Sequence, residues 1–193
     1  MDALSFLRSE HESVLGMIES LERGRGNSQP ELDARNHLTT SLVMAASQHE
    51  AVEEQFFWPA VRQSLPDGDA LADQGINQEE SGKQLLQMIE DSEAGNEQFE
   101  QALTEFLATL REHIEFEQSQ VWPQFRKSQP PQAMEELGQK MAAAKKTAPT
   151  RPHPDTPSSS GVQKTVGPAA AVADKARDMF SGRRSHQPPD PPS

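Results

Sequence analysis

Two segments of the sequence repeat a pattern of side chains that can bind metal ions. In each, a histidine is followed by a glutamate four residues later, a tryptophan nine residues later and a proline ten residues later. The first copy has His49, Glu53, Trp58 and Pro59, and the second has His113, Glu117, Trp122 and Pro123. A single copy is typical of a polar pair on a helix surface. Because both tryptophans of the chain stand at this position, the repeat indicates a shared function.

The spacing places the histidine and glutamate of each copy on the inner side of a helix. Each residue turns an α-helix by about 100°, so residues four apart lie on one face. Apolar residues at three- and four-residue steps continue this face in both segments, among them Leu42, Val52, Leu110 and Ile114. We therefore expect both His–Glu pairs to point into the protein.

Carboxylates on an inward face need a compensating charge. Transfer of an ionised group into an apolar interior costs several kcal/mol or more. Neither segment carries Lys or Arg on its inward face. A pair of metal ions resolves this, because carboxylates can bridge two cations while imidazoles occupy the terminal positions.

Two other segments supply further candidate ligands. His11 lies on or beside an apolar face and is followed by apolar residues six, seven and ten positions later. Glu79 is followed by apolar residues at the same offsets, so it is the expected counterpart of His11. Glu80 is the alternative, although it lies roughly opposite the apolar face of its segment.

These candidate ligands belong to segments with helical periodicity. Apolar spacing and turn-forming residues predict helices over residues 2–23, 31–64, 69–91, 97–127 and 132–146. No segment alternates convincingly with a period of two, so no strand is expected. Four long helices joined by short loops predict an all-α protein with an up-down-up-down four-helix bundle. We expect the bundle over residues 1–127 and a short accessory helix, packed outside, within residues 128–146.

Residues 147–193 differ in composition from the rest. They hold nine of the fifteen prolines and a run of three serines. Such a segment buries too little apolar surface to offset its ordering entropy, so a disordered Pro-rich tail is expected. One stretch, residues 169–180, has helical propensity and is a candidate for folding on a partner.

Composition excludes several classes of protein. The absence of cysteine excludes disulfides, thiolate zinc sites and iron–sulfur clusters. The net charge is −12, and the first 146 residues hold 12 Lys or Arg against 26 Asp or Glu, which argues against nucleic-acid binding. No apolar run is long enough to span a membrane, and no secretory signal peptide is readable. A soluble, cytoplasmic protein is expected; its oligomeric state stays open, with a monomer slightly favoured.

The pattern resembles the hemerythrin-like, HHE cation-binding family. That family has a His on helix one, His-x-x-x-Glu on helix two, a His on helix three and His-x-x-x-Glu on helix four. In this sequence the pattern corresponds to His11, His49 with Glu53, Glu79 in place of a histidine, and His113 with Glu117. The resemblance covers residues 1–127 and includes the aromatic-Pro pair after each glutamate. It implies a non-haem centre of two iron ions, bridged by Glu53, Glu117 and an oxo group, with the other four residues as terminal ligands.

The resemblance further implies a small oxidant as ligand: hydrogen peroxide, dioxygen or nitric oxide. Oxygen-carrying hemerythrins have only histidines at the terminal positions, whereas this chain has Glu79 at one of them. An anionic ligand stabilises iron(III) relative to iron(II) more than a neutral imidazole does. We therefore expect a catalase-like or peroxidase-like reaction with hydrogen peroxide, or an irreversible reaction with dioxygen or nitric oxide. The alternatives are a sensor or store of dioxygen, nitric oxide or iron without turnover, and a metal-free scaffold.

Other metal motifs fit the sequence less well. Ferritin-like centres use Glu-x-x-His, and no histidine here has a glutamate three residues before it. Zinc metalloproteases use His-Glu-x-x-His, whereas Glu53 stands where the second histidine belongs. Residues outside the pattern are expected to be solvated or to flank the site. The solvated set is His37, His153 and His186. The flanking set is Glu50, Glu54, Glu112 and Glu115, whose side chains are expected either to be solvated or to support the ligands from behind. The two tryptophans are expected to pack the bundle next to the site.

Overall fold

The structure, a computed structural model of the chain, describes residues 1–154 and 170–178. Within these residues every regular element is a helix, which confirms the predicted all-α class. The helices are α1 (Ala3–Arg23), α2 (Gln29–Val52), α3 (Trp58–Ser64), α4 (Gly68–Glu90), α5 (Glu97–Phe116), α6 (Trp122–Ser128) and α7 (Pro131–Lys145), with the π-helices η1 (Glu53–Phe57) and η2 (Glu117–Val121). None of the described helices is both long enough and apolar enough to cross a membrane.

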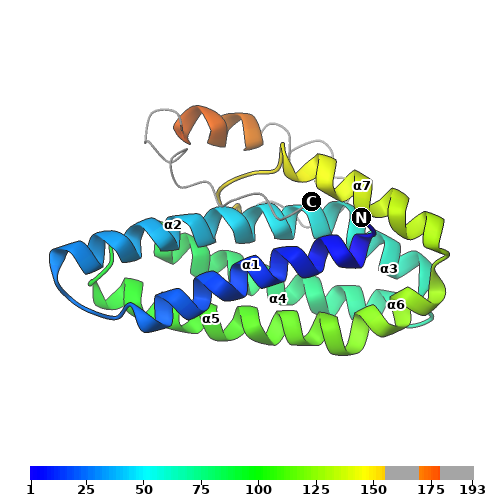
Figure 1. Cartoon of the computed structure of the whole chain (residues 1–193), viewed down its shortest axis with the longest axis horizontal. Coiled ribbons are helices and arrows are strands. Elements are labelled where there is room, and N and C mark those ends of the chain that lie inside the picture. Colours follow the sequence, from blue (N-terminus) through cyan, green and yellow to red (C-terminus); the bar gives the residue numbers. More distant parts are fainter. Residues whose placement is uncertain (155–169, 179–193) are drawn as a thin grey trace.

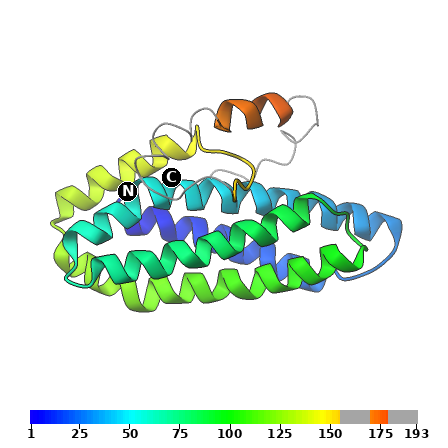
Figure 2. The same ribbon diagram turned by 180° about the vertical axis from the view of Figure 1, so that it is seen from behind.

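The long helices run antiparallel and form the predicted four-helix bundle (Figure 1). Helix α1 packs against α2 and α5, and α4 packs against the same two helices from the other side. The same arrangement is seen from behind in Figure 2. Helix α7 lies outside the bundle, as predicted, and contacts α1, α2 and η1.

The second and fourth predicted helices each contain a π-helical turn that the sequence did not reveal. Each turn begins at the glutamate of the repeat, and the backbone N–H groups of Trp58 and Trp122 bond to the carbonyls of Glu53 and Glu117, five residues back. The prolines after the tryptophans fall in the first turn of α3 and α6. A proline is tolerated there because that position needs no N–H donor. The Trp-Pro pair therefore stands where the π-turn ends and the next α-helix begins.

Polar side chains fix where the helices begin. The Asp2 carboxylate accepts a hydrogen bond from the Ser5 backbone N–H at 2.9 Å, which caps α1. The Glu31 carboxylate accepts one from the Ser28 backbone N–H at 3.0 Å. Helix α2 begins before the expected residue 31, because Pro30 lies within its first turn rather than ahead of it.

The core consists of two apolar clusters stacked along the bundle axis. One gathers aromatic residues around α3, α6 and α7, including Phe57, Trp58, Trp122 and Phe125. The other fills the opposite half with residues of α1, α2, α4 and α5, such as Ile18, Leu42, Leu86 and Phe106. The six candidate ligands come from the stretch between these clusters, so a polar layer separates two hydrocarbon layers.

The C-terminal region is partly described. Residues 147–154, hereafter the C-terminal strap, contact a helix over residues 170–178. This helix lies within residues 169–180, where the sequence predicts helical propensity inside a disordered tail. Asp174 joins the two, since one of its oxygens accepts hydrogen bonds from the backbone N–H groups of Thr150 and Arg151 at 3.0 and 3.2 Å. The rest of the predicted tail, including His186, lies outside the described residues.

One glycine of α4 lets a tryptophan reach the polar layer. A Cβ atom at Gly75 would overlap the six-membered ring of Trp58, whereas a Cβ atom at Gly16 of α1 would meet nothing. We expect Gly75→Ala to lower the free energy of unfolding by about 1–3 kcal/mol, because the indole must shift within a packed core. The matched control Gly16→Ala should raise it by up to about 1 kcal/mol through helix propensity. Urea denaturation of both variants measures the difference, and a stable Gly75→Ala variant would contradict this packing.

Candidate metal centre

The six sequence-predicted residues come together at the centre of the bundle. His11 comes from α1, His49 from α2, Glu79 from α4 and His113 from α5, and Glu53 and Glu117 open the two π-helices. All six side chains are buried, and Glu53 and Glu117 have no exposed surface. They form two groups whose potential ligand atoms lie within 4.8 Å of one another: His11, His49, Glu53 and Glu117 in one, and Glu53, Glu79 and His113 in the other. Glu53 belongs to both groups, so its carboxylate is the residue that the two groups share.

The first group converges on a single small volume. The Nε2 atoms of His11 and His49 are 3.2 Å apart. His11 Nε2 lies 3.2 Å from Glu117 Oε2, and His49 Nε2 lies 3.1 Å from Glu53 Oε2. Four donor atoms on four helical segments therefore face one another, which is the arrangement that a cation between them requires.

The second group is looser and poorer in histidine. His113 Nε2 lies 3.7 Å from Glu53 Oε2 and 3.9 Å from Glu79 Oε1. Of the two glutamates considered for this position, Glu79 is the one within the group. The side chain of Glu80 is 34% exposed and lies 3.6 Å from the ammonium of Lys83.

Two glutamines hold the outer nitrogen atoms of the histidine rings. His113 Nδ1 lies 3.1 Å from Gln78 Oε1, so it can donate a proton there and leave its Nε2 lone pair toward the cluster. The amide of Gln118 lies 3.1 Å from His11 Nδ1. Sequence reasoning missed both glutamines. The only available signal was their position directly before Glu79 and directly after Glu117.

The two tryptophans contact candidate ligands directly, beyond the packing role expected for them. The indole N–H of Trp58 donates a hydrogen bond to Glu79 Oε1. The Trp122 ring stacks on His11 with 5.2 Å between centroids and 12° between planes. The Arg8 guanidinium lies 5.3 Å from the Trp122 ring centroid. Each copy of the repeat thus places its tryptophan against a ligand supplied by a different helix.

Unpaired polar atoms show that the cluster fits a metal site. Buried atoms without a hydrogen-bond partner include both carboxylate oxygens of Glu53 and of Glu117, Oε2 of Glu79 and Nε2 of His113. Buried polar groups are nearly always paired, because leaving one unpaired costs about 1–3 kcal/mol. So many unpaired acceptors in one layer are accounted for when cations occupy the space between them.

Burial and neighbouring charges shift the pKa values of the candidate ligands. Burial and the neighbouring Glu53 raise the pKa of Glu117 well above its usual range. Burial and the charges of Glu54 and Glu53 do the same to the pKa of Glu79. Although burial opposes it, His49 and His113 lower the pKa of Glu53. Burial lowers the pKa of His11 well below its usual range. The neutral form of His11 is the one that binds a metal, whereas Glu79 and Glu117 must lose their protons to the solvent when a cation binds.

The flanking glutamates divide between the two predicted environments. Glu50 and Glu54 are buried rather than solvated, and Glu54 forms an ion pair with Lys83 of α4. Arg35 of α2 is also buried, contrary to the expected absence of inward cations, but it pairs with Glu100 far from the cluster. The sequence does not reveal these two ion pairs, because in each the partner lies on another helix. As expected, Glu112, Glu115 and His37 are exposed; His153 is half-buried and lies 3.1 Å from Asp174 Oδ2.

The bundle and its buried His/Glu clusters define a metal-binding helical-bundle protein. The family model described as hemerythrin HHE cation-binding domain matches residues 2–125. The chain therefore belongs to the hemerythrin HHE cation-binding family.

Two similar proteins carry the same description. An uncharacterised hemerythrin-like protein of Schizosaccharomyces pombe is 25% identical over 154 residues, which cover 79% of this chain and 76% of that protein. The crystal structure of a hemerythrin HHE cation-binding domain-containing protein from Mycobacterium kansasii has a TM-score of 0.64 at 19% identity. The structural match covers 90% of this chain and 99% of the chain from Mycobacterium kansasii. At this identity the structural likeness supports the fold alone.

Glu117→Gln should have opposite effects on the metal-free and metal-loaded protein. At pH 7 the metal-free protein must either keep a proton on Glu117 against the solvent pH or bury its charge, whereas an amide needs neither. We therefore expect the metal-free variant to be more stable by about 1–3 kcal/mol at pH 7. Because the folded-state pKa of this carboxyl is raised, its destabilising effect is absent below about pH 4 and grows as pH rises. The gain should therefore vanish in acid, and the variant should bind metal more weakly.

Urea denaturation after exhaustive chelation, at pH 7 and pH 4, measures the first effect, and titration with Fe²⁺ measures the second. Glu115→Gln is the matched control, because Glu115 is exposed two residues earlier on the same helical segment. A metal-free Glu117→Gln protein less stable than the wild type at pH 7 would contradict the account of the cluster.

The tryptophans provide a second matched pair. Trp58→Phe removes the N–H group that binds Glu79, whereas Trp122→Phe removes an N–H group without a hydrogen-bond partner. We expect Trp58→Phe to weaken metal affinity about 10-fold, as is usual when a group that orients a ligand is lost. Trp122→Phe should leave the affinity within a factor of about 3. Competition with a chromophoric chelator measures both, and equal losses would show that the indole N–H has no role.

Proposed function

We propose that the protein binds two iron ions through His11, His49, Glu53, Glu79, His113 and Glu117 and reacts with hydrogen peroxide in a catalase-like manner. The supporting observation is the membership of Glu53 in both groups of potential ligands. A carboxylate shared by two donor sets is suited to hold two cations side by side. Iron is favoured over other ions that accept imidazole and carboxylate by membership of the hemerythrin family.

Glu79 favours peroxide over reversible dioxygen carriage. With Glu53 and Glu117 it brings the number of carboxylates in the cluster to three, against three imidazoles. An anionic ligand stabilises the higher oxidation state of a metal, so it opposes the reversible release of dioxygen from iron. The Trp58 N–H group holds the Glu79 carboxylate in place and takes up part of its charge.

Disproportionation of peroxide balances without another reactant. One hydrogen peroxide molecule gains two electrons and two protons and becomes two waters. A second loses two electrons and two protons and becomes dioxygen. When bound, a pair of iron ions supplies and recovers the two electrons by cycling between iron(II) and iron(III). Carboxylates of the cluster are the groups placed to hold and return the protons.

The two groups differ in a way that suits ligand binding. The first has four protein residues and the second has three. A metal position with fewer protein ligands keeps more positions for an exogenous molecule, as catalytic metal sites do. We place the reacting peroxide on the side of Glu79 and His113.

The alternative is a sensor or store of dioxygen, nitric oxide or iron. Peroxide added to iron-loaded full-length protein separates the two functions. Sustained evolution of dioxygen, with two peroxides consumed for each dioxygen released, supports the enzyme. A single stoichiometric change in the near-ultraviolet spectrum supports the sensor or store. Elemental analysis showing no bound transition metal would refute both.

Glu79→His tests the charge argument. The variant restores a histidine at the fourth terminal position, which favours iron(II). We expect dioxygen evolution from peroxide to slow by about 10-fold or more, with iron content unchanged and reversible dioxygen binding gained. Glu80→His is the matched control, because that neighbour lies outside the cluster. Oxygen-electrode assays and spectra under alternating argon and air measure the outcome. Unchanged turnover in Glu79→His would overturn the role given to Glu79.

A further inference from the structure

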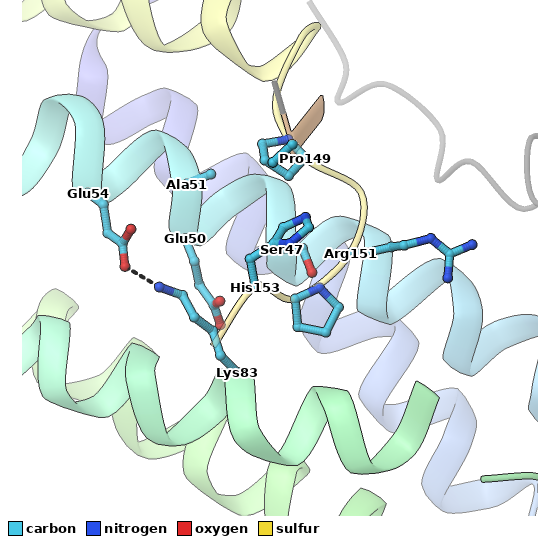
Figure 3. A pocket seen from close by; sticks show the side chains of 10 residues that line it. Ser47, Glu50, Ala51, Glu54, Lys83, Pro149, Arg151 and His153 are labelled. Carbon is cyan, nitrogen blue, oxygen red and sulfur yellow. Dashed lines mark hydrogen bonds and ion pairs between the residues drawn. The ribbon is translucent and has the colours of Figure 1, made fainter. Parts of the chain in front are cut away.

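The candidate centre is closed to solvent, so a ligand must arrive through an adjoining space. Each of the six side chains is at least 95% buried. A pocket with a free volume of about 30 Å³ lies between α2, α4 and the C-terminal strap (Figure 3). Its lining includes Ser47, Glu50, Glu54 and Lys83.

Two side chains that line this pocket are buried without hydrogen-bond partners. The hydroxyl of Ser47 and Oε2 of Glu50 have none, and both residues are 5% exposed. They stand three residues apart on α2, so they lie on one face of the helix. Glu54 differs, because it is paired with Lys83. Buried polar groups aimed into a pocket without a protein partner mark a place for a small polar molecule.

The pocket and the centre both draw side chains from α2 and α4. Glu50 directly follows His49 in the sequence, and Gly82 comes one turn after Glu79. A methyl group at Gly82 would lie 3.4 Å from Glu50 Oε1 and 3.6 Å from the Phe106 ring. The glycine thus keeps α4 free of a side chain next to Glu50, one turn from Glu79 in the sequence.

The strap covers the pocket and is held by polar contacts. Arg151 pairs with Glu90 of α4 at 2.9 Å and with Asp178 at 3.2 Å. The Thr150 hydroxyl donates a hydrogen bond to Asp178 at 2.7 Å. Pro149 and His153 of the strap lie over the pocket beside Ser47 and Glu50 (Figure 3). Contacts of this kind open more readily than a packed apolar core.

We propose that Ser47 and Glu50 form a receiving site for hydrogen peroxide on its way to the buried centre. This rests on the proposed function and adds selectivity between oxidants. Hydrogen peroxide has two O–H donors and two acceptor oxygens. It can donate to Glu50 Oε2 while its oxygen accepts from the Ser47 hydroxyl. Dioxygen and nitric oxide have no hydrogen to donate, so Glu50 gives them no comparable contact.

Two oxidants and three variants test the proposal. Iron-loaded, reduced full-length protein is mixed anaerobically with hydrogen peroxide or with nitric oxide in a stopped-flow spectrometer. We expect Glu50→Leu to slow the bimolecular reaction with peroxide roughly 10-fold and Ser47→Ala roughly 3-fold. The reaction with nitric oxide should stay within a factor of about 2 in both variants. Gly82→Ala narrows the passage for every ligand and should slow both reactions, while its better helix propensity preserves folding.

Ser41→Ala is the matched control, because the Ser41 hydroxyl on the same helix already donates to the His37 carbonyl. Iron content is measured for each variant. Should Glu50→Leu fail to load iron, Ser47→Ala decides the outcome. Equal rates for peroxide in wild type and Ser47→Ala, or equal slowing of both oxidants by Glu50→Leu, overturn the receiving site. A wild type that binds no iron, or binds iron and ignores peroxide, refutes the proposed function instead.

Discussion

Burial of three carboxylates and three imidazoles in one layer is the constraint on which the rest of this structure depends. The layer lies between two apolar clusters, where hydrocarbon can neither hydrate a charge nor accept a proton. Metal-free, the cluster leaves both oxygens of Glu53 and Glu117 without hydrogen bonds. Such a layer opposes folding unless cations occupy it. Metal binding therefore contributes to folding as well as to chemistry, because the ligands exist as a set only in the folded chain.

The backbone accommodates the buried polar layer through two π-turns rather than through loops. Each turn opens at a cluster glutamate and ends at a tryptophan that contacts a ligand from another helix. Trp58 reaches Glu79 of α4 because Gly75 leaves room for its ring. The π-turn, the tryptophan and the glycine thus act together to fix one carboxylate. In the second copy, at the same distance from its histidine, Trp122 instead stacks on His11 of α1.

Features encoded by contiguous periodicity could be predicted from the sequence, whereas features made by distant contacts could not. The helices and the convergence of His11, Glu79 and the two His–Glu pairs follow from apolar spacing, because the bundle directs each apolar face inward. The π-turns could not be predicted from apolar spacing, because a shift of one backbone hydrogen bond leaves the side-chain periodicity nearly unchanged. The sequence left open whether Glu54 is solvated or buried, because its partner Lys83 lies on another helix. The helix over residues 170–178 owes its contacts to Thr150 and Arg151, more than fifteen residues earlier.

The asymmetry of the cluster and the position of the pocket agree with each other. Glu79 and His113 form the group with fewer protein ligands. The charges of Glu54 and Glu50, which line the pocket, reach Glu79 strongly enough to raise its pKa together with burial and Glu53. The group with fewer protein ligands, on η1, α4 and α5, therefore lies within electrostatic reach of the pocket between α2 and α4. In the proposed function, a molecule received at the Ser47–Glu50 pair goes on to this group. In the proposed function, one half of the centre receives the oxidant and the other half serves as the electron partner.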